Sequence, residues 1–332
     1  MKPFATGLVV GKFAPLHCGH EKLINTALAQ CEELFIISYS VPEMPDCEPE
    51  KRLTWLQVRF PQATILVLTP ELVALYNFPA IPHNDADIHR HYVATLCLQI
   101  LRCRPHAVFT AEDYGDGFAN VLARRFAQPV EHVRMARPVG DEAPSGTLIR
   151  SDVHRYRYML ANDVYYSFVR RICLLGGEST GKSTLSKALA DGLDTVYVAE
   201  FGRDYWEEKN GILTADDLLH IACEQVRREQ QAEANHYLIC DTSPLTTLFY
   251  ALDQYGHAPQ ELHQLAEREY SLVVLCGAEF PFVQDGTRQG EVFRARQQVW
   301  YEQELSRRNI PYLSVSGSLQ ERLGQILHRL PD

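Results

Sequence analysis

The chain has 332 residues, more than one typical domain core holds, so two domains are expected. Hydrophobic residues make up 46% and charged residues 22%, close to the globular average, which excludes a disordered, collagen-like or coiled-coil protein. The formal net charge of −10, from 32 Lys plus Arg and 42 Asp plus Glu, argues against a duplex nucleic-acid binder, whose footprint is basic.

Short apolar segments alternate with helical patterns along the chain. Strands are predicted in the first half at residues 5–10, 34–40, 64–68 and 107–110, and in the second half at 171–175, 196–199, 237–240, 272–276 and 312–315. Strands that alternate with helices form right-handed βαβ units and parallel sheets. The first strand of each half leads into a glycine-containing turn and a helix, at 20–29 and 182–189. We therefore predict an α/β fold with two doubly wound parallel-sheet domains in tandem.

The boundary between the two domains should lie near Val169. Residues 151–170 are rich in Tyr and Arg and contain neither Gly nor Pro, which is typical of a helix and not of a flexible linker. We expect this segment to be a connector helix packed between the domains. The predicted domains are then residues 1–168, ending with the connector helix, and residues 169–332.

The nine cysteines are scattered and form no CxxC pair, so no zinc-ribbon spacing is present. Several lie inside apolar segments, where a reduced cysteine acts as a small hydrophobic residue. We expect a reducing, cytoplasmic compartment. The sequence shows no signal peptide and no run of 18 apolar residues, so we expect a protein that is not embedded in a membrane.

The first glycine-containing turn reads GKFAPLHCGH, from Gly11 to His20. It follows a strand and precedes a helix, where backbone N–H groups and the helix dipole favour an anionic ligand. Two imidazoles three residues apart can both reach one polyphosphate and stabilise charge on it. The alternative is a turn with two incidental histidines. The predicted ATP-binding residues here are Gly11, Lys12, Phe13, His17, Gly19 and His20.

A second motif, PSGTLIR, spans residues 144–150. Hydroxyls and an Arg side chain at a helix start form a phosphate site, although Ser and Thr are also ordinary helix caps. Together the two motifs resemble the signatures of the nucleotidyltransferases that adenylylate small phosphate-bearing molecules, with Pro144 in place of Ile. The resemblance implies that His17 and His20 bind the ATP triphosphate. It implies that the β- and γ-phosphates are bound by Ser145, Thr147 and Arg150.

The second glycine-containing turn reads GGESTGKST and matches the P-loop pattern G-x-x-x-x-G-K-[ST]. The backbone amides of such a loop hold phosphates, Lys182 reaches the β- and γ-oxygens, and the Ser183 hydroxyl binds Mg²⁺. No N-K-x-D tetrad of GTPases is present, which favours a kinase. The predicted ATP-binding residues are Gly176, Gly177, Glu178, Ser179, Thr180, Gly181, Lys182, Ser183 and Thr184.

Polar residues after the later strands complete the predicted kinase site. Asp241 ends an apolar strand, where a carboxylate that organises Mg²⁺ belongs. Glu200, Arg203 and Asp204 follow the strand at 196–199, where carboxylates can orient or deprotonate an acceptor hydroxyl; the alternative is that Asp204 begins an ordinary solvated helix. Arg288 and Arg294 lie in a turn suited to a lid over ATP phosphates, or in a solvated helix start.

Nearly end to end, the chain resembles the bifunctional NadR-type proteins, which join a nicotinamide-nucleotide adenylyltransferase to a ribosylnicotinamide kinase. Besides the two phosphate motifs, the similar stretches are residues 108–116, 200–205, 241–247 and 282–288. The resemblance implies a P-loop domain that phosphorylates nicotinamide riboside and an N-terminal domain that adds AMP from ATP to give NAD. ATP is then the co-substrate and Mg²⁺ the cofactor. It also places Glu112, Tyr114 and Asp285 in substrate sites.

Three departures from the family pattern keep alternatives open. Some members carry an N-terminal helix-turn-helix domain, which we expect to be absent because the first strand begins by Ala5. The usual Asp-Thr-Asp is here Asp241-Thr242-Ser243, and residues 81–93 contain no Trp, which leaves stacking on the pyridine to a histidine or Tyr92. The alternatives are the same folds acting on other acceptors, or a nucleotide-binding regulator with one degenerate site. A link to a nicotinamide riboside transporter and a homo-oligomer are also left open.

Overall fold

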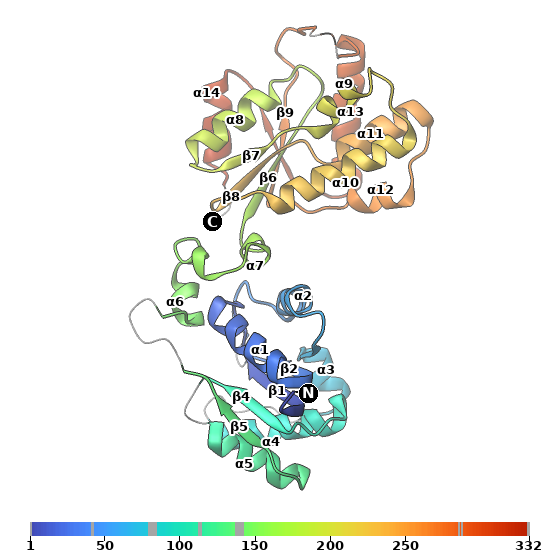
Figure 1. Cartoon of the computed structure of the whole chain (residues 1–332). Helices are drawn as coiled ribbons and strands as arrows, with labels where there is room; N and C mark the ends of the chain where they lie inside the picture. The colour runs from blue at the N-terminus through green and yellow to red at the C-terminus, as the bar shows by residue number, and fades with distance from the viewer. Residues whose placement is uncertain are drawn as a thin grey trace. The chain divides into compact units, whose positions relative to one another are not determined.

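The computed structural model describes residues 2–40, 43–78, 85–111, 115–136, 143–284, 286 and 288–330. The chain divides into two compact units, Met1–Ser167 and Phe168–Asp332. Within the described residues each unit has one five-stranded sheet, and every pairing between neighbouring strands is parallel (Figure 1). The predicted α/β class with two parallel-sheet domains is confirmed.

The first unit has the strand order β3-β2-β1-β4-β5. The strands are β1 (Phe4–Gly11), β2 (Cys31–Ser38), β3 (Thr64–Val67), β4 (Ala107–Thr110) and β5 (Glu131–Arg134). The helices are α1 (Cys18–Gln30), α2 (Pro49–Arg59), α3 (Pro70–Leu75), α4 (Ala86–Leu96), α5 (Gly115–Phe126) and α6 (Gly146–Ser151), and α4 continues as a π-helical turn, η1 (Cys97–Leu101). The chain returns to the middle of the sheet between β3 and β4, so the carboxyl ends of β1 and β4 flank the topological switch point, where α/β sheets bind ligands.

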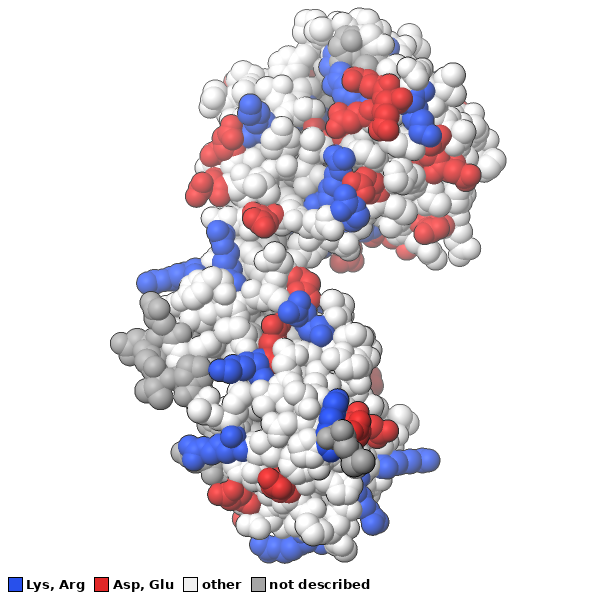
Figure 2. All heavy atoms as spheres, viewed as in Figure 1, with Lys and Arg blue, Asp and Glu red and all other residues white. Residues whose placement is uncertain are grey.

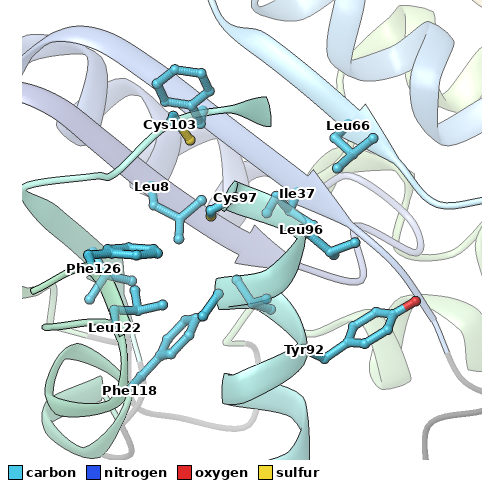
Figure 3. Close-up of a cluster of buried hydrophobic side chains, with 14 of the residues drawn as sticks. Leu8, Ile37, Leu66, Tyr92, Leu96, Cys97, Cys103, Phe118, Leu122 and Phe126 are labelled. Carbon is cyan, nitrogen blue, oxygen red and sulfur yellow. The ribbon is translucent and has the colours of Figure 1, made fainter. Parts of the chain in front are cut away.

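A core of apolar side chains joins β1, β2 and β3 to α4 and α5 (Figure 3). Tyr92 of α4 belongs to this core, is only 5% exposed, and packs edge-to-face on Phe78 with ring centroids 5.4 Å apart. Tyr92 was a sequence-based candidate for stacking on a pyridine ring, and the structure makes it a core residue instead. The core fixes α4 and α5 on the sheet and so holds the strand ends in place.

The connector is not one continuous helix. It consists of two short helices, η2 (Arg157–Met159) and α7 (Asn162–Tyr166), separated by extended backbone at Leu160 and Ala161. Tyr165 of α7 is buried, and Ser167 accepts a hydrogen bond from the Trp55 indole at 3.1 Å. These contacts fasten the segment to the first unit. The single-helix prediction was wrong because helical propensity does not reveal where packing bends the chain.

The second unit has the strand order β10-β9-β6-β8-β7. Its strands are β6 (Arg170–Leu175), β7 (Val196–Val198), β8 (Tyr237–Asp241), β9 (Leu272–Cys276) and β10 (Tyr312–Val315). Its helices are α8 (Lys182–Gly192), α9 (Phe201–Glu208), α10 (Ala215–Gln231), α11 (Pro244–Tyr255), α12 (Gln260–Leu265), α13 (Glu291–Arg307) and α14 (Leu319–Leu327). One apolar cluster packs the sheet against α10–α13 and another against α8 and α14, so both faces are covered and the strands read as continuous apolar runs.

Three further properties bear on the sequence analysis. In the described part of the chain, no helix combines the length and hydropathy needed to cross a bilayer. All nine cysteines are free thiols. On the face shown in Figure 2, acidic and basic side chains are interspersed on both units.

Candidate active sites

In the first unit, His17 and His20 lie together at the start of α1. β1 ends at Gly11 and α1 begins at Cys18, with His17 as its N-cap. The His17 Nδ1 accepts the backbone N–H of His20 at 3.4 Å, and the two rings stack with centroids 3.7 Å apart. Both imidazoles therefore stand where the helix dipole favours a bound anion.

The turn between β1 and α1 is held from beneath. Phe13 is fully buried and packs edge-to-face on His20, with centroids 5.0 Å apart, whereas Lys12 is exposed. The Lys12 carbonyl accepts hydrogen bonds from the Ser38 hydroxyl at 3.0 Å and from Arg52 at 3.3 Å. Arg52 is fully buried and also donates to both carboxylate oxygens of Glu43, at 2.9 and 2.7 Å. These contacts tie the turn to β2 through Ser38 and to α2 through Arg52.

The second motif of this unit meets the first although they are far apart in sequence. Ser145 caps α6 by accepting the Leu148 N–H at 3.1 Å. Arg150 donates to the Ala14 carbonyl, 136 positions away, and to the Thr147 hydroxyl at 3.4 Å. A Cβ on Gly146 would lie 2.9 Å from the Ala14 oxygen, so only glycine allows this approach. The structure thus gathers the predicted hydroxyls, the arginine and the histidines around one turn.

The carboxyl end of β4 contributes a second polar group beside the switch point. Thr110 and His132 are hydrogen-bonded at 2.9 Å, and the other ring nitrogen of His132 lies 2.7 Å from an Asp116 oxygen. Sequence reasoning did not find His132 because β5, which carries it, was not predicted. The predicted substrate residues Glu112 and Tyr114 lie outside the described residues.

In the second unit, the P-loop connects β6 to α8. Gly176 and Gly181 have φ angles of 143° and 82°, which other residues rarely adopt. The Lys182 ammonium donates to the carbonyls of Gly176 and Gly177 at 2.9 and 3.1 Å, and the Thr180 hydroxyl donates to Gly177 at 2.8 Å. The loop therefore folds around its own lysine at the start of a helix, which is the arrangement that binds phosphates.

A cavity of about 320 Å³ opens beside the P-loop. This volume lies at the lower end of the range of small-molecule sites. The predicted residues that line it are Glu178, Ser179, Thr180, Gly181, Lys182, Ser183, Thr184, Glu200, Arg203 and Arg288. The lining does not include five other residues predicted for this site, namely Gly176, Gly177, Asp204, Asp241 and Arg294. The predicted residue Asp285 lies outside the described residues.

Asp241, at the end of β8, is buried beneath the P-loop. The Ser183 hydroxyl donates to its carboxylate, and burial raises the pKa of Asp241 while the Lys182 ammonium opposes that rise. Its Oδ1 is buried and has no hydrogen-bond partner in the part of the chain that the structure describes. An unpartnered carboxylate oxygen beside a hydroxyl fits Mg²⁺, which takes one or two protein oxygens and completes its shell with phosphate oxygens and water.

The two candidate base residues of α9 have different surroundings. Glu200 is the N-cap residue, lines the cavity and has its pKa raised by burial, with the Lys182 ammonium opposing. Asp204 lies one helical turn further along α9 and is exposed to solvent. The structure therefore places Glu200, and not Asp204, against the cavity.

The predicted lid is fastened to the P-loop. The Ser179 hydroxyl oxygen accepts from the Val283 N–H at 3.0 Å and from Arg288 at 3.2 Å. The Gln289 N–H donates to the Glu178 carboxylate at 2.8 Å. Arg288 consequently sits at the cavity, close to where phosphates would bind.

Several supporting residues of the P-loop were missed by sequence reasoning. Gln297 and Gln298 of α13 accept the N–H groups of Glu178 and Gly177 at 3.0 and 3.1 Å. Arg322 of α14 is buried and donates to the Thr180 carbonyl at 2.8 Å. The predicted lid residue Arg294 also has a supporting position, since it is 5% exposed and donates to the Phe280 carbonyl and to Glu291.

The chain is similar to known proteins along most of its length. The trifunctional NAD biosynthesis/regulator protein NadR of Escherichia coli (strain K12) is 29% identical over 311 residues, which are 85% of this chain and 71% of that protein. The chain is a homologue of the NadR proteins. The resemblance inferred from the motifs is confirmed. A family model described as an AAA domain also matches residues 171–322 of this NadR homologue.

Solved structures agree on the fold. The crystal structure of NadR in complex with NAD and AMP-PNP superposes with a TM-score of 0.63 at 19% identity, covering 99% of this chain and 96% of that one. NadR in complex with NR gives a TM-score of 0.62 at 20% identity, covering 97% and 95%. The succession of the two α/β units in the chain is therefore that of NadR.

Proposed function

We propose that this NadR homologue is a bifunctional enzyme of NAD salvage. Residues 169–332 phosphorylate nicotinamide riboside with ATP to give the mononucleotide. Residues 1–168 then transfer AMP from a second ATP to the mononucleotide, which gives NAD and pyrophosphate. The observation that carries the proposal is that each parallel sheet has its own phosphate-type turn with basic side chains at a helix start. The ligands named for the NadR crystal structures, NAD with AMP-PNP and NR, support it.

In the kinase reaction, the 5′-hydroxyl oxygen of the riboside attacks the γ-phosphorus of ATP, and the bond to the departing ADP oxygen breaks. Glu200 accepts the hydroxyl proton, while Lys182 and Arg288 stabilise charge on the phosphoryl oxygens. Ser183 and Asp241 would hold Mg²⁺, which when bound would neutralise negative charge on the ATP phosphates. Positioning and electrostatics account for the catalysis, with no covalent intermediate.

In the adenylyl transfer, a phosphate oxygen of the mononucleotide attacks the α-phosphorus of ATP and pyrophosphate leaves. His17 and His20 bind the triphosphate, and Arg150, with the Ser145 and Thr147 hydroxyls, binds its β- and γ-phosphates. Donors that are fixed before the reaction stabilise the charge that develops on the leaving group. The contact between Arg150 and the Ala14 carbonyl supports this assignment because it ties the two sets of donors together.

The direct test is coupled turnover. With nicotinamide riboside, ATP and Mg²⁺, mass spectrometry should detect the mononucleotide first and NAD afterwards, with ADP and pyrophosphate as co-products. With the mononucleotide supplied instead, NAD should form without ADP. If neither the mononucleotide nor NAD forms in any of these mixtures, the proposal is wrong.

A second candidate function keeps both reactions but changes the nucleoside. Ser243 lines the cavity where NadR-type proteins usually have an Asp, so one negative charge is absent there. Its hydroxyl accepts the Leu245 N–H at 3.2 Å and caps α11. A less acidic cavity favours a neutral nucleoside over the cationic pyridinium. A panel of neutral ribosides beside nicotinamide riboside, ranked by kcat/KM, separates the two candidates.

Glu200→Gln should lower kcat for mononucleotide formation by about 10²–10⁴-fold, the usual contribution of a positioned general base. Because burial raises the pKa of Glu200, the wild-type rate should fall as pH drops through that raised value, where the carboxyl becomes protonated. The variant should lack this dependence. Asp204→Asn is the matched comparison, and a large loss with Asp204→Asn but not with Glu200→Gln would assign the base to the other carboxylate.

A further inference from the structure

One face of α10 forms a wall of the cavity beside the P-loop. Leu218, Ile221 and Gln225 of α10 line the cavity at spacings of three and four residues, so they share one stripe of the helix. Trp206 of α9 and Leu213 add apolar surface. A wall of this composition fits a flat aromatic ring better than it fits a sugar or a phosphate.

Gln225 introduces a hydrogen-bond donor into this wall. Its side-chain oxygen accepts the backbone N–H of Phe201 at 3.1 Å. Only the carbonyl oxygen of an amide can accept from an N–H group, so this contact settles which end of the side chain is which. The Nε2 amide is thereby directed away from Phe201, and the side chain is only 2% exposed.

The Nε2 group of Gln225 is buried and has no hydrogen-bond partner among the described residues. A buried donor without a partner costs about 1–3 kcal/mol, and native proteins seldom leave one unexplained. Because Gln225 borders the cavity, a ligand that presents an acceptor there removes this cost. A ligand without an acceptor leaves the cost in place, so the group discriminates between ligands.

We propose that Gln225 is a specificity-determining residue of the kinase unit and that its Nε2 donates to the carboxamide oxygen on the pyridine ring of the substrate. This inference rests on the proposed function and names the contact that selects the base. The ring lies against Trp206 and the aliphatic side chains of α10, while the ribose extends toward Glu200 and Lys182. The acidic side chains of Glu178 and Glu200, which also line the cavity, complement the positive charge of the pyridinium.

The variant must separate this contact from a structural role, since Gln225 also binds the N–H that directly follows Glu200. Gln225→Glu keeps an oxygen facing Phe201 and replaces the Nε2 donor by a second acceptor. Gln231→Glu is the matched control, because it adds the same charge on an exposed turn of the same helix. Both variants should retain the thermal stability and the KM for ATP of the wild type.

The test compares two substrates, nicotinamide riboside and the pyridinium riboside that lacks the carboxamide. The added carboxylate acts on the pyridinium charge of both substrates alike, so the lost donor is measured by the ratio of their kcat/KM values. Gln225→Glu should lower kcat/KM for nicotinamide riboside, relative to that for the unsubstituted riboside, by about 10- to 100-fold, the size of one buried hydrogen bond. Gln231→Glu should change neither. Equal losses with both substrates, as a ribose contact or a structural role would give, overturn the proposal, and so does no loss with either. If the wild type phosphorylates neither riboside, the proposed kinase function is overturned and the carboxamide contact with it.

Discussion

Lys182→Ala should lower mononucleotide formation at least about a hundredfold and leave NAD synthesis from supplied mononucleotide unchanged. The ammonium group lies within the P-loop, donating to Gly176 and Gly177 at 2.9 and 3.1 Å. Burial raises the pKa of Glu200 and of Asp241, and the Lys182 ammonium, followed by Arg203, opposes that rise. Its removal takes away the charge that stabilises the transferring phosphoryl group, an interaction of the kind whose loss costs about 10²–10³ in kcat.

Removal of Lys182 should also change the pKa values of the Glu200 and Asp241 carboxyl groups. Because the ammonium holds down the pKa of Glu200 and of Asp241, its loss should raise both pKa values further. The residual kinase activity of Lys182→Ala should then reach its plateau only at higher pH than in the wild type. A pH profile that Lys182→Ala leaves unshifted would contradict the predicted action of the ammonium on these carboxylates.

The matched control for Lys182→Ala is Lys187→Ala. Lys187 lies on the same helix and is exposed, so its loss should affect neither reaction. Chromatography that separates ADP, the mononucleotide and NAD measures both activities in one sample. A folded Lys182→Ala protein that lost both activities would contradict the assignment of one reaction to each unit.

The central strands of both sheets follow from the sequence, whereas one edge strand does not. β6 and β8 are apolar runs because helices cover both faces of their sheet. In β1 the successive residues Leu8 and Val9, which point to opposite faces, are both fully buried. β5 was missed because its four residues, Glu131 to Arg134, are all at least partly exposed and show no apolar run. Its extended conformation comes from pairing with β4 between partners distant in sequence, such as Ala107 and Glu131.

The candidate sites likewise contain residues that the sequence reveals and residues that only the structure reveals. A phosphate-binding turn is a local structure, so its residues are contiguous and the sequence reveals them. The residues that support it come from far along the chain. Arg52 and Arg322 each occupy a position on the core-facing stripe of a helix, near Trp55 and Ile326, and only the folded structure shows what they bind. Glu200 and Asp204 are four residues apart, and burial alone distinguishes them.

His20 is a better target than His17 for testing the adenylyltransferase. His17 is 5% exposed and caps α1 through its Nδ1, so its replacement would cost about 1 kcal/mol of stability as well as a ligand contact. His20 contributes only its backbone N–H to that cap. Its ring lies between the His17 ring and the edge of Phe13, so an alanine leaves the backbone of the turn supported by Arg52 and Arg150.

His20→Ala should therefore lower NAD formation from mononucleotide and ATP by at least about a hundredfold, as expected when a fixed donor to the developing charge is removed. Mononucleotide formation from the riboside should be unchanged, so the mononucleotide should accumulate in the coupled assay. Lys22→Ala, at an exposed position on the same helix, is the control and should make NAD at the wild-type rate. Undiminished NAD synthesis by His20→Ala would show that the His20 imidazole does not bind the triphosphate. The adenylyltransferase assignment would then rest on His17, Arg150 and the hydroxyls of α6.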